Sequence, residues 1–147
     1  MLDKESAKKA AIEYLSRREH SQQEISAKLS AKGIQPGDIQ DILIWLKDKN
    51  LQSDARFTES FVNSRINKGH GPIKIAAELK AKGINASASA LGLNENEWVE
   101  LAQNVREKRF GKEFPTDQKQ KAKQIRFLQY RGFSFDQVKC ALNDNDY

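Results

Sequence analysis

The sequence predicts an all-α protein built from three tandem three-helix repeats. Charged residues make up 31% of the chain, whereas glycine and proline number only 8 and 3, which favours helices over a turn-rich β protein. A glycine-centred pattern recurs along the chain, and apolar residues repeat at the spacing i, i+3, i+4, i+7. The hydrophobic fraction of 38% predicts a thin core, which suits small helical units better than one large domain.

Three glycines mark the repeat: Gly33, Gly83 and Gly132 are separated by 50 and then 49 residues. A leucine lies four residues before each glycine, and an isoleucine or phenylalanine follows directly after it. A glycine in the left-handed conformation ends a helix, and the apolar residue after it packs back on the last turn. Each glycine is therefore expected at the corner between the second and third helices of a repeat, with boundaries at 1–52, 53–94 and 95–147.

The first repeat shows each of its helices clearly. Apolar positions predict a helix near residues 5–18. Ser21 and Glu24 have the spacing of a capping box at the start of the second helix. The third helix is indicated by apolar residues at i, i+3, i+4 and i+7: Ile39, Ile42, Leu43 and Leu46.

The middle repeat is less regular. Its first helix is predicted near residues 54–68 and its second around Ile75 and Leu79. The segment "NASASALGL" alternates serine and alanine before a glycine, so the third helix of this repeat should be short.

The last repeat opens with an apolar stripe of helical spacing: Trp98, Leu101, Ala102 and Val105. The segment "GKEFPTD" predicts a loop with Thr116 as the N-cap of the next helix. The second and third helices are marked by four further apolar residues: Ile125, Leu128, Val138 and Leu142. Three aromatic residues lie off the apolar stripes of their helices, Trp45, Phe127 and Tyr130, and we expect them in contacts between helices or repeats, with core packing as the alternative.

Enzyme chemistry has little support in the residues. Two histidines and one cysteine cannot form a usual zinc ligand set without several carboxylates. Cys140 lies among apolar positions, so we expect a buried, inert thiol, and no disulfide can form within the chain. No phosphate-binding P-loop or nucleophile-elbow motif occurs. We predict no catalytic, cofactor-binding or metal-binding residue.

The amino terminus has no signal-peptide pattern, and no apolar run approaches the length that spans a membrane. We therefore expect a cytoplasmic protein without a membrane partner. We also expect it to be a monomer.

The stretch "NKGHGPIKI" at residues 67–75 allows two interpretations. Backbone amides before a helix start can bind an anion such as phosphate. The favoured interpretation is structural: Gly69 ends one helix, Gly71 is the N-cap of the next, and Pro72 occupies its first position.

Basic residues cluster in two places. Between Arg106 and Arg131, nine Lys or Arg residues face three acidic ones, a local net charge of +6 within a chain of net charge +5. Residues 60–77 hold three basic residues and no acidic one. A solvated helix face and a surface for a negatively charged partner both fit such patterns. Sequence-specific DNA binding is disfavoured, because the third helices lack the basic and amide residues of a groove-reading helix.

The central region "DARFTESFVNSRINKGHGPIKIAAELKAKGI" resembles the signature of the RecX family, bacterial regulators of the RecA recombinase. The family motif R-F-x-x-[ST/A]-F, then an arginine, then G-x-G-P and I-x-x-E-L-x-x-K-G-I, falls on Arg56, Phe57, Ser60, Phe61, Arg65, Gly69, Gly71, Pro72, Ile75, Glu78, Leu79, Lys82, Gly83 and Ile84. The segments "YLSRREHSQQEI" and "KAKQIRFLQYRGFSFDQV" extend the resemblance over nearly the whole chain.

The resemblance implies an elongated, curved arrangement of the three repeats and no cofactor. It also implies binding to the RecA–single-stranded-DNA filament, with inhibition of strand exchange, ATP hydrolysis and co-protease activity. We expect the partner-binding residues to be Arg56, Arg65, Lys68, Lys74, Arg109, Lys123, Arg126 and Arg131.

Three alternatives stay open from the sequence. Arg56 and Arg65 could instead form ion pairs within the protein. The protein could antagonise recombination by binding single- or double-stranded DNA without sequence preference. It could also be a helical scaffold for an unrelated partner.

Overall fold

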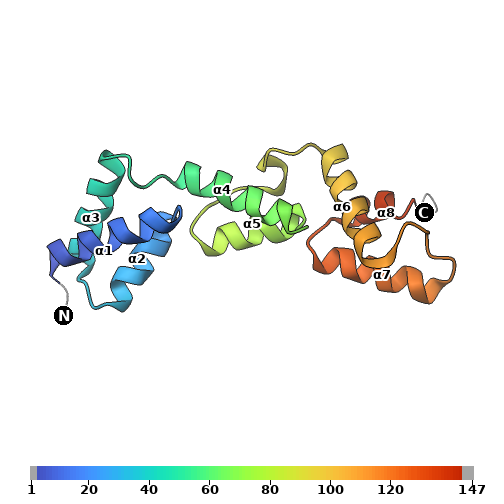
Figure 1. Ribbon diagram of the computed structural model, residues 1–147, viewed down its shortest axis with the longest axis horizontal. Coiled ribbons are helices and arrows are strands. Elements are labelled where there is room, and N and C mark those ends of the chain that lie inside the picture. The colour runs from blue at the N-terminus through green and yellow to red at the C-terminus, as the bar shows by residue number, and fades with distance from the viewer. Residues whose placement is uncertain (1–2, 144–147) are drawn as a thin grey trace. The chain divides into compact units, whose positions relative to one another are not determined.

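The computed structural model describes residues 3–143. This part of the chain is all-α and contains no strand (Figure 1). Its elements, in order, are α1 (Lys4–Arg17), α2 (Gln22–Ala31), α3 (Pro36–Asp48), α4 (Asp54–Asn67), α5 (Pro72–Ala81), the single 3-10 turn η1 (Ala88–Ala90), α6 (Glu95–Phe110), α7 (Gln118–Tyr130) and α8 (Phe135–Ala141). The predicted all-α class is confirmed.

The chain divides into two compact units. The first comprises Met1–Phe61 and Lys80–Ile84, and the second comprises Val62–Leu79 and Asn85–Tyr147. Both α4 and α5 therefore contribute residues to each unit. The boundaries 1–52, 53–94 and 95–147 stay a prediction, and their outermost residues, 1–2 and 144–147, lie outside the described part of the chain.

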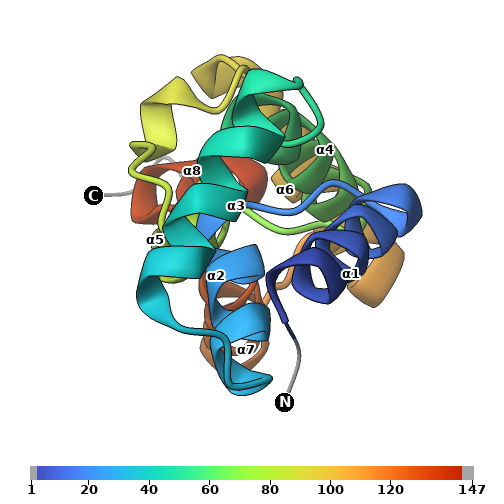
Figure 2. The same ribbon diagram turned by 90° about the vertical axis from the view of Figure 1, so that its left-hand side faces the viewer.

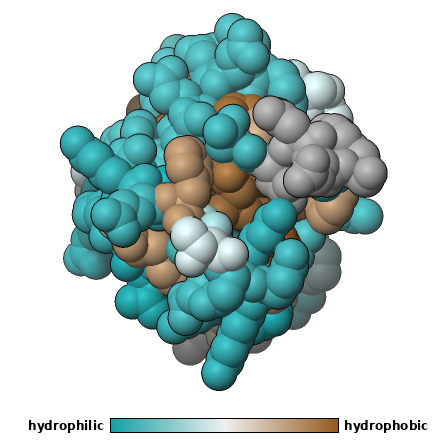
Figure 3. Space-filling view, turned by 90° about the vertical axis from the view of Figure 1, so that its right-hand side faces the viewer, coloured by the Kyte–Doolittle hydropathy of each residue, from teal (hydrophilic) through white to brown (hydrophobic). Residues whose placement is uncertain are grey.

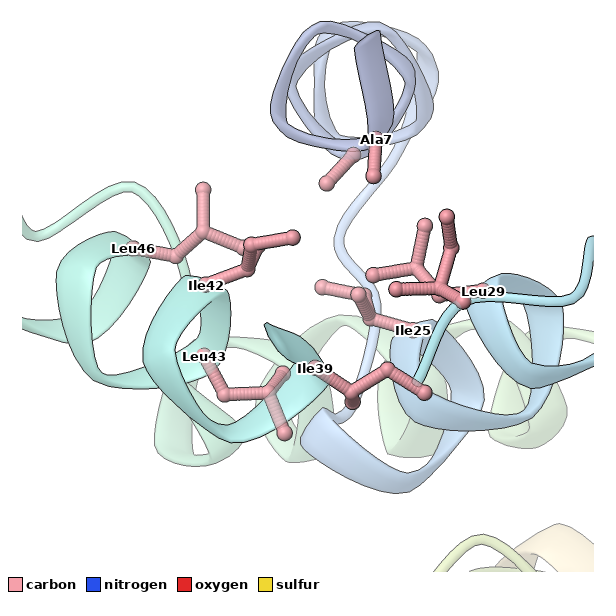
Figure 4. Close-up of a cluster of buried hydrophobic side chains, with 9 residues drawn as sticks. Ala7, Ile25, Leu29, Ile39, Ile42, Leu43 and Leu46 are labelled. Atoms are coloured by element: carbon pink, nitrogen blue, oxygen red, sulfur yellow. The ribbon is translucent and has the colours of Figure 1, made fainter. Parts of the chain in front are cut away.

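The first unit contains α1, α2 and α3 (Figure 2). Aliphatic side chains from these three helices form one core (Figure 4). Ile25 and Leu29 reach this core from α2, Ile42 and Leu46 reach it from α3, and Ala7 faces it from α1. All five side chains have no solvent exposure. The predicted apolar stripes of these helices are therefore core-facing, as their spacing indicated.

Local chemistry sets the helix ends in this unit. The Ser21 hydroxyl accepts a hydrogen bond from the Glu24 amide at 3.1 Å, and the Glu24 carboxylate accepts one from the Ser21 amide at 3.1 Å. This is the predicted capping box. At the other end of α2, Gly33 has φ +84°, and the Ile34 amide donates to the Leu29 carbonyl at 3.2 Å.

The equivalent glycines of the other repeats adopt the same conformation. Gly83 has φ +82° and Gly132 has φ +99°. Residues with a Cβ rarely adopt this region, so glycine allows the sharp turn that ends each helix. The three predicted glycine corners are confirmed.

In the second unit, α6 packs against α7 and α8. Trp98 and Ala102 of α6 are buried together with Leu128 of α7 and Val138 of α8. Hydrophilic side chains cover most of the face of this unit shown in Figure 3, and hydrophobic side chains gather near its centre. The burial of one stripe on each helix is what holds this part of the chain together.

The structure decides four details of the predicted elements. The third helix of the middle repeat is indeed short, since only the η1 turn forms there. The N-cap of α7 is Asp117 and not Thr116, because the Asp117 carboxylate accepts from the Gln120 amide at 2.7 Å. Cys140 is exposed, so the expectation of a buried thiol is wrong: it lies on the solvent side of the short helix α8. Tyr130 is 76% exposed, so the core-packing alternative is wrong, but its ring contacts Lys74 of α5.

Among the helices that the structure describes, none is both long enough and apolar enough to cross a membrane.

Candidate partner-binding site

The glycine-rich stretch at residues 69–72 forms a corner in the second unit. Gly69, with φ +80°, follows the end of α4, and α5 begins at Pro72. The Gly71 amide donates to the Arg131 carbonyl at 2.7 Å, and the Ile73 amide donates to the Gly132 carbonyl at 2.9 Å. Amides at the start of α5 are therefore paired with carbonyls at the end of α7. The structural interpretation of this stretch is confirmed. The phosphate interpretation is disfavoured, because the Gly71 and Ile73 amides already donate to carbonyls of the protein.

His70, in the middle of this corner, faces a carboxylate. Its Nδ1 lies 3.5 Å from Glu78 Oε1, and the other oxygen of Glu78 accepts from Arg65 Nε at 2.9 Å. Burial lowers the pKa of His70, and the positive charge of Lys74 lowers it further. In the described residues, no group of three or more His, Cys, Asp or Glu side chains could hold a metal ion.

Two of the predicted partner-binding arginines form ion pairs within the protein. Arg65 pairs with Glu78, as described above, within the second unit. In the first unit, Arg56 Nε donates to Glu19 at 3.1 Å, and its terminal nitrogens donate to the side chain and the carbonyl of Asn50 at 2.9 Å each. The alternative that Arg56 and Arg65 form ion pairs within the protein is therefore confirmed. Their role in partner binding stays a prediction.

Three other predicted residues, Lys68, Arg109 and Arg131, come together in the second unit. They line a pocket of about 370 Å³ between the end of α4, one face of α6 and the end of α7. We call this the basic pocket. Its complete lining is Ile66, Asn67, Lys68, Gly69, Leu101, Asn104, Val105, Lys108, Arg109, Phe127 and Arg131.

The basic pocket owes its shape to the local sequence. Leu101 and Val105 belong to the apolar stripe of α6, but both stay partly exposed and form part of the pocket wall. Gly69 keeps the corner close to this wall, because a Cβ there would lie 2.9 Å from a methyl carbon of Val105. The glycine of the family-like motif thus brings the end of α4 against α6.

The positive charges of the basic pocket are not neutralised by any residue that the structure describes. Its lining contains four cationic side chains and no carboxylate, and none of the four forms an ion pair with a described residue. Arg131 donates to the Lys68 carbonyl at 3.1 Å and stacks over Phe127, with 5.0 Å from Cζ to the ring centroid. Arg109 lies 5.7 Å from the same ring centroid. These contacts orient the two guanidinium groups while leaving their charge available.

The remaining predicted residues do not line the basic pocket. The ammonium group of Lys74 lies 5.0 Å from the ring centroid of the exposed Tyr130. Lys123 and Arg126 are exposed on α7. Their role in partner binding stays a prediction.

Lys108 is the pocket cation that sequence reasoning left out of the site. It lies seven residues after Leu101 on α6, so it is two helical turns away on the same face. Helical spacing from the apolar stripe was the signal that could have selected it.

Arg106, also in the basic run, has a different role. Its side chain is buried, with 1% of the residue exposed. It donates to the carbonyls of Lys112 and Glu113 at 3.2 Å each and to the buried amide oxygen of Gln124 at 3.4 Å. Arg106 therefore fixes the loop between α6 and α7, which orients the two helices whose side chains form the basic pocket.

Family models and curated relatives match this chain over most of its length, and all of them point to one family. The family models described as the first, second and third three-helix domains of RecX match residues 7–46, 53–90 and 95–142. Among curated relatives, the "Regulatory protein RecX" of Vibrio campbellii is 43% identical over 143 residues, covering 96% of this chain and 92% of the relative. That of Halorhodospira halophila is 40% identical over 139 residues, covering 93% and 86%.

A solved structure supports the same assignment. The crystal structure of RecX from Lactobacillus salivarius superposes with a TM-score of 0.78 at 25% identity, covering 96% of this chain and 95% of that chain. Three-helix domain models, relatives and fold thus coincide over the same residues. The chain belongs to the RecX family of regulatory proteins.

Proposed function

We propose that this protein is a noncatalytic regulator that binds the RecA–single-stranded-DNA filament and inhibits its strand exchange, ATP hydrolysis and co-protease activity. The observation that carries the proposal is membership of the RecX family over nearly the whole chain, with relatives named regulatory proteins. RecA is the partner that this family implies.

The basic pocket supports binding to a negatively charged surface. Four cations without a carboxylate partner repel one another, and a partner that supplies negative charge relieves this repulsion. Such charges steer the encounter and fix its orientation, while contacts repeated on neighbouring filament subunits strengthen binding overall.

The direct test adds the protein at substoichiometric amounts to preformed RecA filaments and follows ATP hydrolysis together with co-sedimentation. We expect inhibition and co-sedimentation with the filament. A protein that neither slows hydrolysis nor sediments with filaments would contradict the proposal.

A pair of matched variants tests the pocket within this assay. Lys68→Glu/Arg109→Glu reverses two pocket charges on exposed side chains. Lys112→Glu/Lys119→Glu makes the same change in net charge at exposed positions of the same unit outside the pocket. We expect the first variant to need several-fold more protein for half-maximal inhibition, and the second to behave like the unchanged protein. Equal effects of both variants would remove the basic pocket from the site.

The alternative, a DNA-binding module that occupies DNA and so antagonises recombination, is favoured by the same uncompensated cations. It predicts binding to naked DNA that falls with salt by roughly 0.9 log unit per log unit of salt for each duplex phosphate neutralised. Fluorescence anisotropy with labelled DNA, in the absence of RecA, separates the two functions. Inhibition of filaments at salt concentrations that abolish binding to naked DNA would exclude the alternative.

A further inference from the structure

We infer that the basic pocket binds an acidic peptide segment of a protein partner, in which carboxylates flank an apolar side chain. This inference rests on the proposed function for the identity of the protein that carries the segment. The chemistry of the segment follows from the side chains that line the pocket.

The charged part of the pocket fits carboxylates. Arg109 and Arg131 present planar guanidinium groups, which pair with a carboxylate through two parallel hydrogen bonds. Lys68 and Lys108 add two ammonium groups in the same lining. With no acidic side chain among the lining residues, a ligand carboxylate has no internal competitor.

The apolar part of the pocket fits a side chain next to those carboxylates. Ile66, Leu101 and Val105 line it and are all partly exposed. A volume of about 370 Å³ is at the low end of small-ligand sites, which span about 300–1,000 Å³. It accommodates one or two side chains, and burial of an apolar one there removes hydrophobic surface from water.

The polar side chains of the lining can pair with a peptide backbone. Asn67 and Asn104 line the pocket and are exposed. An asparagine amide both donates and accepts, so it can pair with the amide and carbonyl of a peptide backbone.

The aromatic ring of the lining disfavours a single-stranded nucleic acid as the ligand. Single-stranded nucleic acids are bound on aromatic rings with open faces. Phe127 is contacted by two guanidinium groups, and Phe110 packs edge-on against it with centroids 5.3 Å apart. These contacts leave it poorly placed to stack on a base.

The experiment uses the full chain and a synthetic peptide with the core Asp-Leu-Asp, followed by two-dimensional NMR so that weak binding is detected. We expect saturable shifts at the Leu101 and Val105 methyl groups and the Asn104 side-chain amide. Two control peptides, with cores Asn-Leu-Asn and Asp-Gly-Asp, test the charged and the apolar part separately. Each is expected to bind several-fold more weakly.

Variants locate the site. Lys108→Gln/Arg109→Gln is expected to weaken peptide binding by about tenfold or more, because charge-assisted hydrogen bonds are lost. Lys112→Gln/Lys119→Gln loses the same charge outside the pocket and should bind the peptide unchanged. Equal weakening by both double variants would show a nonspecific charge effect and overturn the inference.

Three further outcomes decide between the proposals. Absence of pocket shifts with the Asp-Leu-Asp peptide, in a protein that still inhibits RecA filaments, would overturn the inference and leave the proposed function intact. Pocket shifts with a short oligothymidylate at lower concentration than with the peptide would also overturn it. Peptide binding without filament inhibition would instead contradict the proposed function alone.

Discussion

Gly71 packs so closely against the backbone of Gly132 that it could not carry a Cβ atom, and the start of α5 leaves no room for a Cβ on Gly132. A Cβ on Gly71 would lie 2.5 Å from the carbonyl oxygen of Gly132, and one on Gly132 would lie 2.7 Å from the backbone nitrogen of Lys74. The obstacles are backbone atoms and the Cβ of Lys74, which cannot move aside as the far end of a flexible side chain does. This contact allows the Gly71 amide to reach the Arg131 carbonyl at 2.7 Å, which joins the start of α5 to the end of α7.

We expect Gly71→Ala to destabilise the protein. The added methyl group forces the two backbone segments apart, and such overpacking typically costs about 1–3 kcal/mol of the free energy of unfolding. Urea denaturation followed by circular dichroism measures the loss. Gly37→Ala is the matched control, since nothing lies within 4 Å of a Cβ at Gly37 in α3. It should leave stability unchanged or raise it by up to about 1 kcal/mol. Similar stability of the two variants would contradict the role of the contact.

Arg106→Ala should be strongly destabilising although it removes a charge from a crowded basic region. The substitution leaves a cavity, and two loop carbonyls lose their donor. Truncation of a large buried side chain costs about 2–5 kcal/mol. Arg126→Ala removes an equal charge from the exposed surface of α7 and should change stability by less than about 0.5 kcal/mol. Thermal unfolding of both variants tests this, and an unaffected Arg106→Ala protein would disprove the structural role.

Glu24 predicts a dependence of stability on acid pH. Burial raises its pKa, but hydrogen bonds from Arg18, Lys82 and the Ser21 amide outweigh this and lower the pKa from 4.5 to about 2. The folded state therefore favours the ionised form. The resulting stabilisation is present above pH 4.5 and is lost as the pH falls from 4.5 towards 2.

The matching measurement compares the unchanged protein with Glu24→Gln across this range. With allowance for solvent screening, we expect the variant to be less stable by on the order of 1–2 kcal/mol near pH 6. This difference in the free energy of unfolding between the variant and the unchanged protein, the stability gap, should narrow as the pH approaches 2. Glu13→Gln, which removes an exposed ion pair with Arg17, should show little difference at either pH. A gap for Glu24→Gln that stays constant with pH would contradict the lowered pKa.

His20 predicts a second dependence of stability on pH. Burial lowers the pKa of this imidazole, and the charges of Arg18 and Lys28 lower it further. Its Nε2 lies 2.8 Å from the Lys28 ammonium, and its Nδ1 lies 3.1 Å from the Arg18 carbonyl. The folded state thus favours the neutral ring, so this stabilisation is present above pH 6.5 and is lost as the pH falls through the lowered pKa.

NMR titration of the His20 ring measures that pKa directly, and we expect a value below 6.5. Lys28→Gln should move it upwards, because one repelling charge is removed while the burial remains. Lys32→Gln, on the same helix end, is the control and should leave it almost unchanged. A titration of His20 at or above its ordinary value would show that the ring is not buried in solution.

The local elements of this fold could be predicted well from the sequence. Helix ends depend on neighbouring residues, as at Ser21 and Glu24, and a left-handed corner needs a glycine, as at Gly33. Apolar spacing selects the buried stripe of each helix because the helical period is fixed. The small errors arose where two candidates were adjacent, as for Thr116 and Asp117, or where a residue lies on the solvent side of a helix whose neighbouring positions are buried, as for Cys140 beside Ala141.

The candidate site depended on tertiary structure to a greater degree. Charge in the sequence selected Lys68, Arg109 and Arg131, but equally selected Arg56 and Arg65, which pair with Glu19 and Glu78. Folding determines which arginine has a carboxylate within hydrogen-bond distance and which does not. The order of charges along the chain does not predict this.

The sequence by itself determined the helices, their glycine corners and the family, because these depend on residue type and spacing over short distances. The tertiary structure alone decided which cations around the basic pocket have no carboxylate partner among residues 3–143, and that the Gly71 and Ile73 amides are paired with the end of α7. Both outcomes depend on contacts between residues more than thirty positions apart, such as Lys68 with Arg131, whose distance is set by packing and not by local pattern.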